Sequence, residues 1–321
     1  MVARLIFFLT FLTLNSQSLP TATDPILYDI YPFIRVYKNG TIQRFIGQDF
    51  APPSTDPTTG VRSKDVHFSH LSARLYLPKN AARKLPLLIY FHGGGFFTES
   101  AFSPTYHHHL ISLVATAQIV AVSVNYRLAP EHPLPAAYQD AWLALQWTFS
   151  HYTDPWLKRH ADFDQFYLGG DSAGANIAHR MAVRVGPGVN LRGMFLNCPF
   201  FLGKKAIGNE SGDVYAETQM RKLWLYAYPN STGLDDPLVN PGMDPGLGRV
   251  GCQRVLVYVA GNDVLRFRGR YYAAALGRSG WKGEVKVVEV QGESHVFNLI
   301  NPNSSKAVAM LRVLASFLNY S

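Results

Sequence analysis

A single serine, Ser172, stands among residues with almost no side chain in the segment GGDSAG. The segment FDQFYLGG before it is typical of a short strand, and ANIAHRMAVRV after it is typical of a helix. The pattern G-x-S-x-G marks a sharp strand-to-helix turn that lifts the serine hydroxyl above a sheet. We therefore expect Ser172 to be a nucleophile, although a glycine-rich corner with an incidental serine would show the same pattern.

A serine hydroxyl becomes a good nucleophile only when a base takes its proton, and that base must itself be oriented. Asp263 follows the strand-like run VLVYVA, and His295 lies in the loop after VKVVEV. Taken singly, Asp263 could cap the following helix and His295 could be a surface histidine. Together, in the order serine, acid, histidine and each just beyond a strand, they predict a catalytic triad.

The segment HGGGFF, residues 92–97, follows the strand-like run LPLLIYF. Acyl transfer places negative charge on the carbonyl oxygen of the substrate, and fixed backbone N–H groups stabilise that charge. Glycines allow such close approach because they carry no Cβ. We expect the N–H groups of Gly93, Gly94 and Ala173 to form this oxyanion hole; a merely flexible glycine loop is the alternative.

Strand-like apolar runs alternate with helix-like segments along most of the chain. This alternation favours a mostly parallel sheet with helices on both faces, built by residues 19–321 as one α/β domain. The segment from about 200 to 240 breaks the rhythm and, with the N-terminal segment, is expected to form a small cap. The predicted strands are 71–78, 85–92, 119–126, 166–170, 191–198, 254–261 and 284–290, and the predicted helices are 136–151, 267–280 and 306–319.

The composition excludes several classes of partner. The chain has 321 residues, 47% of them hydrophobic, and a net charge of +8. Its Lys and Arg residues are scattered, which argues against nucleic-acid binding. The two cysteines, Cys198 and Cys252, have no CxxC partner and are expected to be buried free thiols, with no metal site. The run YHHH at residues 106–109 is interpreted as a solvated helix surface because adjacent helical side chains point in different directions.

The N-terminal residues differ from the rest of the chain. One cation, Arg4, precedes an apolar run from Leu5 to Leu14, which is too short to span a bilayer but fits a signal peptide over residues 1–18. The sequence therefore predicts entry into the secretory pathway, with the cytoplasm as the alternative. Asn39, in the predicted hairpin turn KNGT, is the best candidate for glycosylation. The remaining N-x-S/T sites are Asn209, Asn230, Asn303 and Asn319.

Several longer segments resemble the plant carboxylesterases of the hormone-sensitive-lipase-like branch of the α/β-hydrolases. The likeness runs from about Asp24 to the C-terminus, and its segments are HGGGFF, NYRLAPEHPLPAAYQD, GGDSAGANIAH, AGNDVLRFRG, SGW and ESHVF. It implies an α/β-hydrolase fold, the same triad and oxyanion donors, and a structural role for His92. It also implies a buried polar network among Arg127, Glu131 and Asp140. Phe267 stands where the family usually has a second Asp, which we expect to alter the pocket lining.

The activity implied by the resemblance is hydrolysis of small to medium apolar carboxylic esters through an acyl-enzyme, without metal or organic cofactor. Isoflavanone dehydratases and alkaloid cyclases resemble the same family and leave elimination as an alternative. Gibberellin receptors also resemble it but lack the triad histidine, which is present here. Four aromatic residues could line an apolar substrate pocket, although a core position is the commoner explanation for any one of them: Phe96, Phe97, Trp224 and Tyr228.

Overall fold

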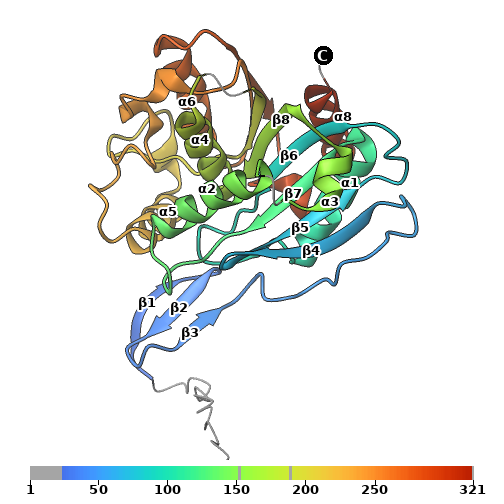
Figure 1. The fold of residues 1–321 in the computed structure, drawn as a ribbon. Helices are drawn as coiled ribbons and strands as arrows, with labels where there is room; N and C mark the ends of the chain where they lie inside the picture. The colour runs from blue at the N-terminus through green and yellow to red at the C-terminus, as the bar shows by residue number, and fades with distance from the viewer. Residues whose placement is uncertain (1–23, 151–152, 188–189, 320–321) are drawn as a thin grey trace, which may run out of the picture.

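The computed structural model describes residues 24–150, 153–187 and 190–319. Its centre is an eight-stranded sheet in the order β11-β10-β9-β8-β6-β7-β5-β4, in which β4 and β7 run antiparallel to β5 and the remaining pairs are parallel (Figure 1). The predicted mostly parallel sheet is confirmed. Its strands are β4 (Arg62–Phe68), β5 (Leu71–Leu77), β6 (Leu85–Phe91), β7 (Val120–Asn125), β8 (Ala161–Asp171), β9 (Leu191–Asn197), β10 (Arg254–Ala260) and β11 (Glu284–Val290).

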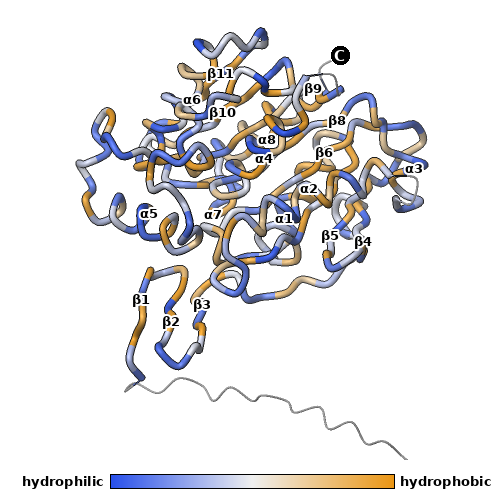
Figure 2. Tube along the Cα trace, turned by 60° about the vertical axis from the view of Figure 1, so that its left-hand side comes forward, coloured by the Kyte–Doolittle hydropathy of each residue, from blue (hydrophilic) through white to orange (hydrophobic). Residues whose placement is uncertain are grey.

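Alternate side chains of the central strands enter two separate cores, one on each face of the sheet. In β6, Leu87, Ile89 and Phe91 belong to one buried cluster, whereas Leu88 and Tyr90 belong to the other. Figure 2 shows the hydrophobic residues concentrated along these inner strands. Because both faces are buried, the strands have continuous apolar runs rather than alternating polar and apolar residues.

Helices cover both faces, as predicted. On one face α1 packs against α8, and on the other α4 packs on β8 and β9 while α6 packs on β10 and β11 (Figure 1). The helices are α1 (Pro104–Ala117), α2 (Ala136–Thr148), α3 (Pro155–His160), α4 (Ala173–Val185), α5 (Val214–Ala227), α6 (Arg266–Arg278), α7 (Phe297–Ile300) and α8 (Ser305–Leu318). Short 3-10 turns occur at Glu210–Gly212, Pro241–Met243 and Leu247–Arg249.

A second, small antiparallel sheet lies at one corner of the molecule (Figures 1 and 2). It comprises β1 (Ile26–Ile30), β2 (Ile34–Tyr37) and β3 (Ile42–Arg44). The predicted KNGT turn connects β2 to β3, where the side chain of Asn39 accepts a hydrogen bond from the Thr41 N–H at 2.9 Å. Tyr28 of β1 stacks on Tyr226 of α5 with ring centroids 4.1 Å apart. The N-terminal segment and the insertion between residues 200 and 240 therefore pack on each other.

The YHHH segment departs from its predicted exposure. His107 is only 5% exposed, and its ring lies within hydrogen-bond distance of Arg74 and Tyr76. Tyr106 is also buried, His109 is half-buried, and His108 is the one exposed residue of the four. The interpretation of a solvated surface was wrong because α1 packs directly on the sheet over this turn. Cys198 and Cys252 are buried free thiols, as predicted.

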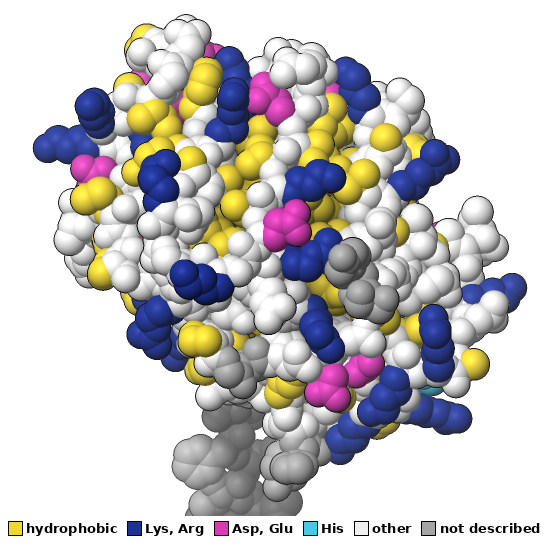
Figure 3. Space-filling model, turned by 90° about the horizontal axis from the view of Figure 1, so that it is seen from above, with side chains coloured by type: hydrophobic (Ala, Val, Ile, Leu, Met, Phe, Trp, Pro, Cys, Tyr) yellow, Lys and Arg dark blue, Asp and Glu magenta, His cyan; other side chains and the backbone are white. Residues whose placement is uncertain are grey.

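On the face seen from above, Lys and Arg side chains are scattered between hydrophobic ones (Figure 3). No helix among the described residues combines the length and the apolar character needed to cross a membrane. The proposed signal peptide, residues 1–18, lies outside the described residues.

Candidate active site

Ser172 occupies the turn between β8 and α4, with φ of 50° and ψ of −118°. A non-glycine residue with positive φ is strained, and such strain is typical of a nucleophile held at a sharp turn. A Cβ added to Gly174 would lie 2.0 Å from the carbonyl oxygen of Phe91, and one on Gly170 would lie 2.5 Å from the backbone of Gly174. These contacts explain why the turn needs glycine on both sides of the serine.

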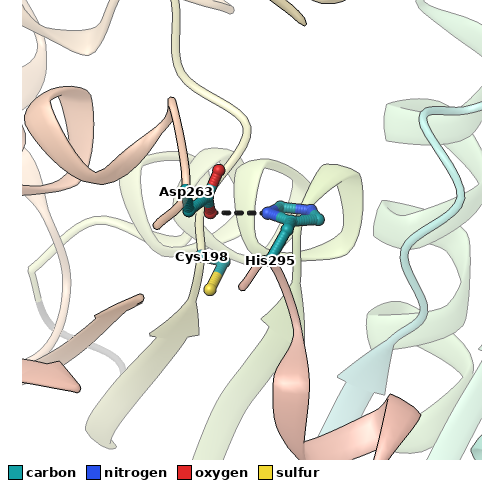
Figure 4. A group of neighbouring side chains, drawn as sticks. All are labelled: Cys198, Asp263 and His295. Carbon is teal, nitrogen blue, oxygen red and sulfur yellow. Dashed lines mark hydrogen bonds and ion pairs between the residues drawn. The ribbon is translucent and has the colours of Figure 1, made fainter. Parts of the chain in front are cut away.

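His295 and Asp263 meet beyond the ends of β11 and β10. His295 Nδ1 and Asp263 Oδ2 are 2.6 Å apart (Figure 4). Ser172, Asp263 and His295 line the same cavity. Within the described residues, no hydrogen bond joins the Ser172 hydroxyl to His295. The structure thus pairs the predicted acid with the predicted base and places the predicted nucleophile in their cavity.

The acid and the base shift each other's pKa. Burial disfavours a charge on His295, but the Asp263 carboxylate outweighs this effect and raises the pKa of the imidazole well above its usual value. Burial alone would raise the pKa of Asp263, yet the charge and hydrogen bond of His295 hold it below its usual value. The pair therefore favours an imidazolium beside a carboxylate, which is the charge state formed when the base takes a proton.

Cys198 lies next to the pair, immediately after β9 (Figure 4). One donor atom each from Cys198, Asp263 and His295 lies within 4.8 Å of the others, so this set could in principle hold a metal ion. Burial raises the pKa of the Cys198 thiol, however, and a protonated thiol is a poor metal ligand. Two of the three donors also share the hydrogen bond of the acid–base pair.

The hydrogen bonds of the glycine loop after β6 argue against one predicted oxyanion donor, Gly93. The N–H of Gly93 donates to the Tyr106 hydroxyl at 2.7 Å, so it is not available to a substrate. The N–H groups of Gly94, Gly95 and Ala173 have no acceptor among the described residues. Gly95 lines the cavity beside Ser172 and was missed from the sequence. The signal was present as the third glycine of HGGGFF, but spacing alone did not show which glycine N–H faces the cavity.

A buried carboxylate supports the two loops from below. Asp171 accepts hydrogen bonds from Tyr90 at 2.7 Å and from Tyr106 at 2.8 Å. Burial raises the pKa of Asp171 to about 6, while the two hydroxyls oppose that shift. Because the Tyr106 hydroxyl also accepts from Gly93, it connects the nucleophile turn to the glycine loop. The charged residue inside GGDSAG was the available sequence signal for this support.

His92 has the structural position implied by the resemblance. Its ring stacks on Tyr126 with centroids 4.2 Å apart, and its Nδ1 lies 2.9 Å from the Gly93 carbonyl oxygen. Tyr126 in turn donates to the carbonyl oxygens of His92 and Gly93. This arrangement fixes the beginning of the glycine loop.

The expected network of Arg127, Glu131 and Asp140 is two separate interactions. Arg127 pairs with Asp140 at 2.7 Å. Glu131 instead pairs with Arg44 of β3 at 2.6 Å, and its side chain is 43% exposed. The inclusion of Glu131 was wrong because the small N-terminal sheet supplies its partner. Arg44 also donates to the Phe97 carbonyl oxygen at 2.6 Å, which ties that sheet to the glycine loop.

The catalytic cavity has a volume of about 560 Å³. Its outer wall, as we name it here, consists of Pro32, Phe33, Ala216, Met220 and Leu223, from the β1–β2 turn and from α5. The segment after β10 also lines the cavity, and it includes Phe267, at which the sequence departs from the family pattern. The remaining lining residues are Gly95, Ser172, Phe200, Asn209, Gly212, Asp213, Asn262, Asp263, Val264, Leu265, Arg266, Phe267, Ser294 and His295.

The four aromatic residues predicted to bind substrate do not line this cavity. Phe96, Phe97 and Trp224 are at most 1% exposed and belong to the core. Phe96 packs edge-on against Trp224, which packs edge-on against the half-buried Tyr228. The structure places Phe96, Phe97 and Trp224 in the core, and the aromatic residues that line the cavity are instead Phe33, Phe200 and Phe267.

Comparison with known proteins agrees with this geometry. The family model described as alpha/beta hydrolase fold matches residues 88–299, which include both glycine-containing turns and the acid–base pair. The chain belongs to the α/β-hydrolase family. This hydrolase is 49% identical to probable carboxylesterase 1 of Arabidopsis thaliana, over 91% of this chain and 97% of the relative. It is 43% identical to 2-hydroxyisoflavanone dehydratase of Glycyrrhiza echinata, over 94% of this chain and 99% of the relative.

Other relatives extend the same comparison. The hydrolase is 44% identical to the chloroplastic tuliposide A-converting enzyme 1 of Tulipa gesneriana, over 96% of this chain and 84% of the relative. Among solved structures it matches a thermostable carboxylesterase cloned from a metagenomic library, with a TM-score of 0.71 and 28% identity. That match covers 80% of this chain and 88% of the other.

Proposed function

We propose that the protein is a serine carboxylesterase that acts on small to medium apolar esters. The observation that carries the proposal is the cavity shared by Ser172 and the His295–Asp263 pair. Its mostly apolar outer wall suits an uncharged acyl or alkyl group. The relatives named carboxylesterases support the same activity.

In the proposed mechanism, Ser172 Oγ attacks the ester carbonyl carbon while His295 Nε2 takes the hydroxyl proton. The N–H groups of Gly94, Gly95 and Ala173 donate to the resulting oxyanion. Collapse of the tetrahedral intermediate breaks the ester bond, and His295 returns the proton to the leaving alcohol. Water, deprotonated by His295, then releases the acid from the acyl-serine. Asp263 stabilises the imidazolium throughout, and no metal or organic cofactor is required.

A panel of aryl and alkyl esters tests the proposal. We expect hydrolysis with a burst of alcohol release and covalent labelling of Ser172 alone by an organophosphate. Labelling at another residue, or the absence of turnover on the whole panel, would contradict it.

Elimination on the same scaffold is the second candidate function. It is favoured by the similarity to 2-hydroxyisoflavanone dehydratase along almost the whole chain. His295 would then act as the base for C–H removal, and Ser172 would not form an acyl intermediate. Incubation with 2-hydroxyisoflavanones, followed by mass spectrometry for the loss of water, distinguishes the two. Retained activity of Ser172→Ala in elimination would favour the dehydratase.

We also propose that the insertion and the small sheet act together as a cap. The outer wall comes from these two segments, and the Tyr28–Tyr226 stack connects them. The rest of residues 19–321 would then form one catalytic domain below the cap. Limited proteolysis that removed β1 to β3 without changing substrate range would contradict this role.

For location, we propose removal of residues 1–18 and entry into the secretory pathway, with the cytoplasm as the alternative. The exposed turn at Asn39 is accessible to a glycan. Intact-mass measurement on protein from its native tissue tests both points. Retention of Met1 without any glycan would favour the cytoplasm.

A further inference from the structure

Among the residues that the structure describes, Arg266 is the one arginine that lines the catalytic cavity. It is the first residue of α6, three positions after Asp263. Its Nη1 donates to the Asp263 carbonyl oxygen at 3.3 Å, and its guanidinium carbon lies 4.2 Å from the centre of the Phe267 ring. The guanidinium is therefore held beside the acid of the triad, in the cavity that the outer wall also lines.

The neighbouring arginines of α6 have acidic partners, and Arg266 does not. Arg268 pairs with Glu210 at 2.6 Å, and Arg270 pairs with Glu289 at 3.3 Å. No carboxylate of the described residues lies within ion-pair distance of Arg266. A cation in the first turn of a helix also opposes the helix dipole, which favours negative charge there. Within the described residues, the Asp263 carbonyl oxygen and the Phe267 ring contact this cation, but no carboxylate neutralises it.

Of the described residues that line the cavity, Arg266 carries the one cation without an acidic partner in this structure. Asp263 and His295 are committed to each other at 2.6 Å. The other charged lining residue is Asp213, which is exposed and caps α5 by accepting from the Ala216 N–H at 2.9 Å. Most of the remaining lining is apolar. A carboxylate entering this cavity would meet a cation with four uncommitted N–H donors in a partly desolvated setting, where charged hydrogen bonds are strong.

We propose that Arg266 selects esters that carry a carboxylate in addition to the ester group, so that the enzyme prefers anionic esters to neutral esters of the same size. This inference rests on the proposed esterase function and adds a substrate class to it. The carboxylate binds the guanidinium while the apolar body of the substrate contacts the outer wall and Phe267. Arg266 acts in binding only and takes no part in proton transfer.

Matched ester pairs test the proposal. Mono-4-nitrophenyl adipate and 4-nitrophenyl hexanoate share a leaving group and a chain length and differ in the terminal carboxylate. The pair 3-acetoxybenzoate and 3-acetoxybenzamide places the charge on the leaving group instead. For each pair we measure the ratio of kcat/KM for the anionic ester to that for the neutral ester, at low and high NaCl. Non-enzymatic rates are subtracted.

We expect Arg266→Gln to lower this ratio roughly ten- to a hundredfold for at least one pair, and Arg266→Lys to lower it less. High NaCl should lower the wild-type ratio and leave that of Arg266→Gln almost unchanged. Arg270→Gln, on the same helix but outside the cavity, is the matched control and should keep the wild-type ratio.

An equal ratio in wild type and Arg266→Gln for both pairs would overturn the inference, as would an equal loss in Arg270→Gln. In that case hydrolysis of the neutral esters would still support the esterase function. Failure of the wild-type enzyme to hydrolyse any of the four esters would overturn both proposals.

Discussion

The two sides of the catalytic cavity are built in different ways. The elbow region, residues 91–95 and 170–174, joins the ends of adjacent central strands, and its backbone atoms are packed so closely that a Cβ on Gly174 would lie 2.0 Å from a carbonyl oxygen. The outer wall comes from a hairpin turn and a helix, with Pro32 exposed and Met220 half-buried. The catalytic groups thus lie where close packing permits almost no movement. The residues that contact the substrate lie where a side chain can be substituted with little loss of stability.

The largest expected effect lies in the elbow region. Ser172→Ala should lower ester turnover by about 10⁴-fold or more, because the nucleophile is lost, while the melting temperature stays within a few degrees of wild type. Turnover measured with a chromogenic ester and thermal unfolding of the same preparation check both points. Ser112→Ala, on the surface of α1, is the control and should match wild type. Near-normal turnover by Ser172→Ala would show that the elbow region does not hold the nucleophile, and the two sides of the cavity would then not differ in this way.

Asp263→Asn should lower kcat by up to about 10⁴-fold, because the amide cannot stabilise the imidazolium and favours the wrong tautomer. In wild type the rate should rise with pH through a midpoint above about 6.5, since His295 accepts a proton only when neutral and Asp263 raises its pKa. Removing the carboxylate charge should move the midpoint to lower pH. A pH–rate profile of both proteins tests the direction in which the midpoint moves. An unmoved midpoint would contradict the electrostatic role of Asp263.

Tyr106→Phe probes the support beneath the elbow region. The change leaves the buried N–H of Gly93 without its acceptor, which costs about 1–3 kcal/mol. We expect a lower melting temperature and roughly tenfold lower kcat, because the glycine loop that carries the oxyanion donors is no longer fixed. Tyr258→Phe is the control, since the hydroxyl of this buried tyrosine makes no hydrogen bond within the described residues. Equal effects of the two changes would exclude a positioning role.

The smallest effect on small substrates is expected at the outer wall. Met220→Ala should change kcat/KM for an acetate ester by about threefold or less and should raise it about tenfold or more for bulkier esters that the methionine excludes. A series of esters with increasing acyl size measures the shift. Thr218→Ala, exposed on the same helix, should leave the series unchanged. A uniform loss for all esters would show that α5 serves the chemistry rather than substrate choice.

The elbow region and the outer wall also differ in how well the sequence predicted them. The central strands, the paired acid and base and the position of Ser172 follow from local signals: apolar runs, glycines and the order of three residues. Gly93 could not be resolved in this way, because the direction of its N–H depends on Tyr106, a partner 13 residues away. The sequence therefore predicts which residues form the elbow region better than it predicts which of their N–H groups face the cavity.

The outer wall had no such local signal. Phe96 and Trp224 are large aromatic residues of the kind that often line a substrate pocket. They are buried instead, because Phe200 and Tyr138 pack around Phe96. Met220 and Phe33 carry no motif, and their place in the cavity depends on how α5 and the first hairpin pack together. Contacts of this kind arise between distant segments and are not visible in spacing.

The small N-terminal sheet also defines a unit for protein engineering. Among the described residues, its polar and stacking contacts with the rest of the molecule are the hydrogen bonds of Arg44 to Phe97, Ala129 and Glu131 and the stack of Tyr28 on Tyr226. Its Ile30, Ile34 and Val36 side chains join the main hydrophobic core. Residues 24–47 of a relative could therefore be grafted onto this chain as one block, provided that the arginine, the tyrosine and apolar residues of similar size occupy positions 44, 28, 30, 34 and 36. Because the block carries Pro32 and Phe33, each graft would exchange two of the five outer-wall residues without touching a catalytic residue.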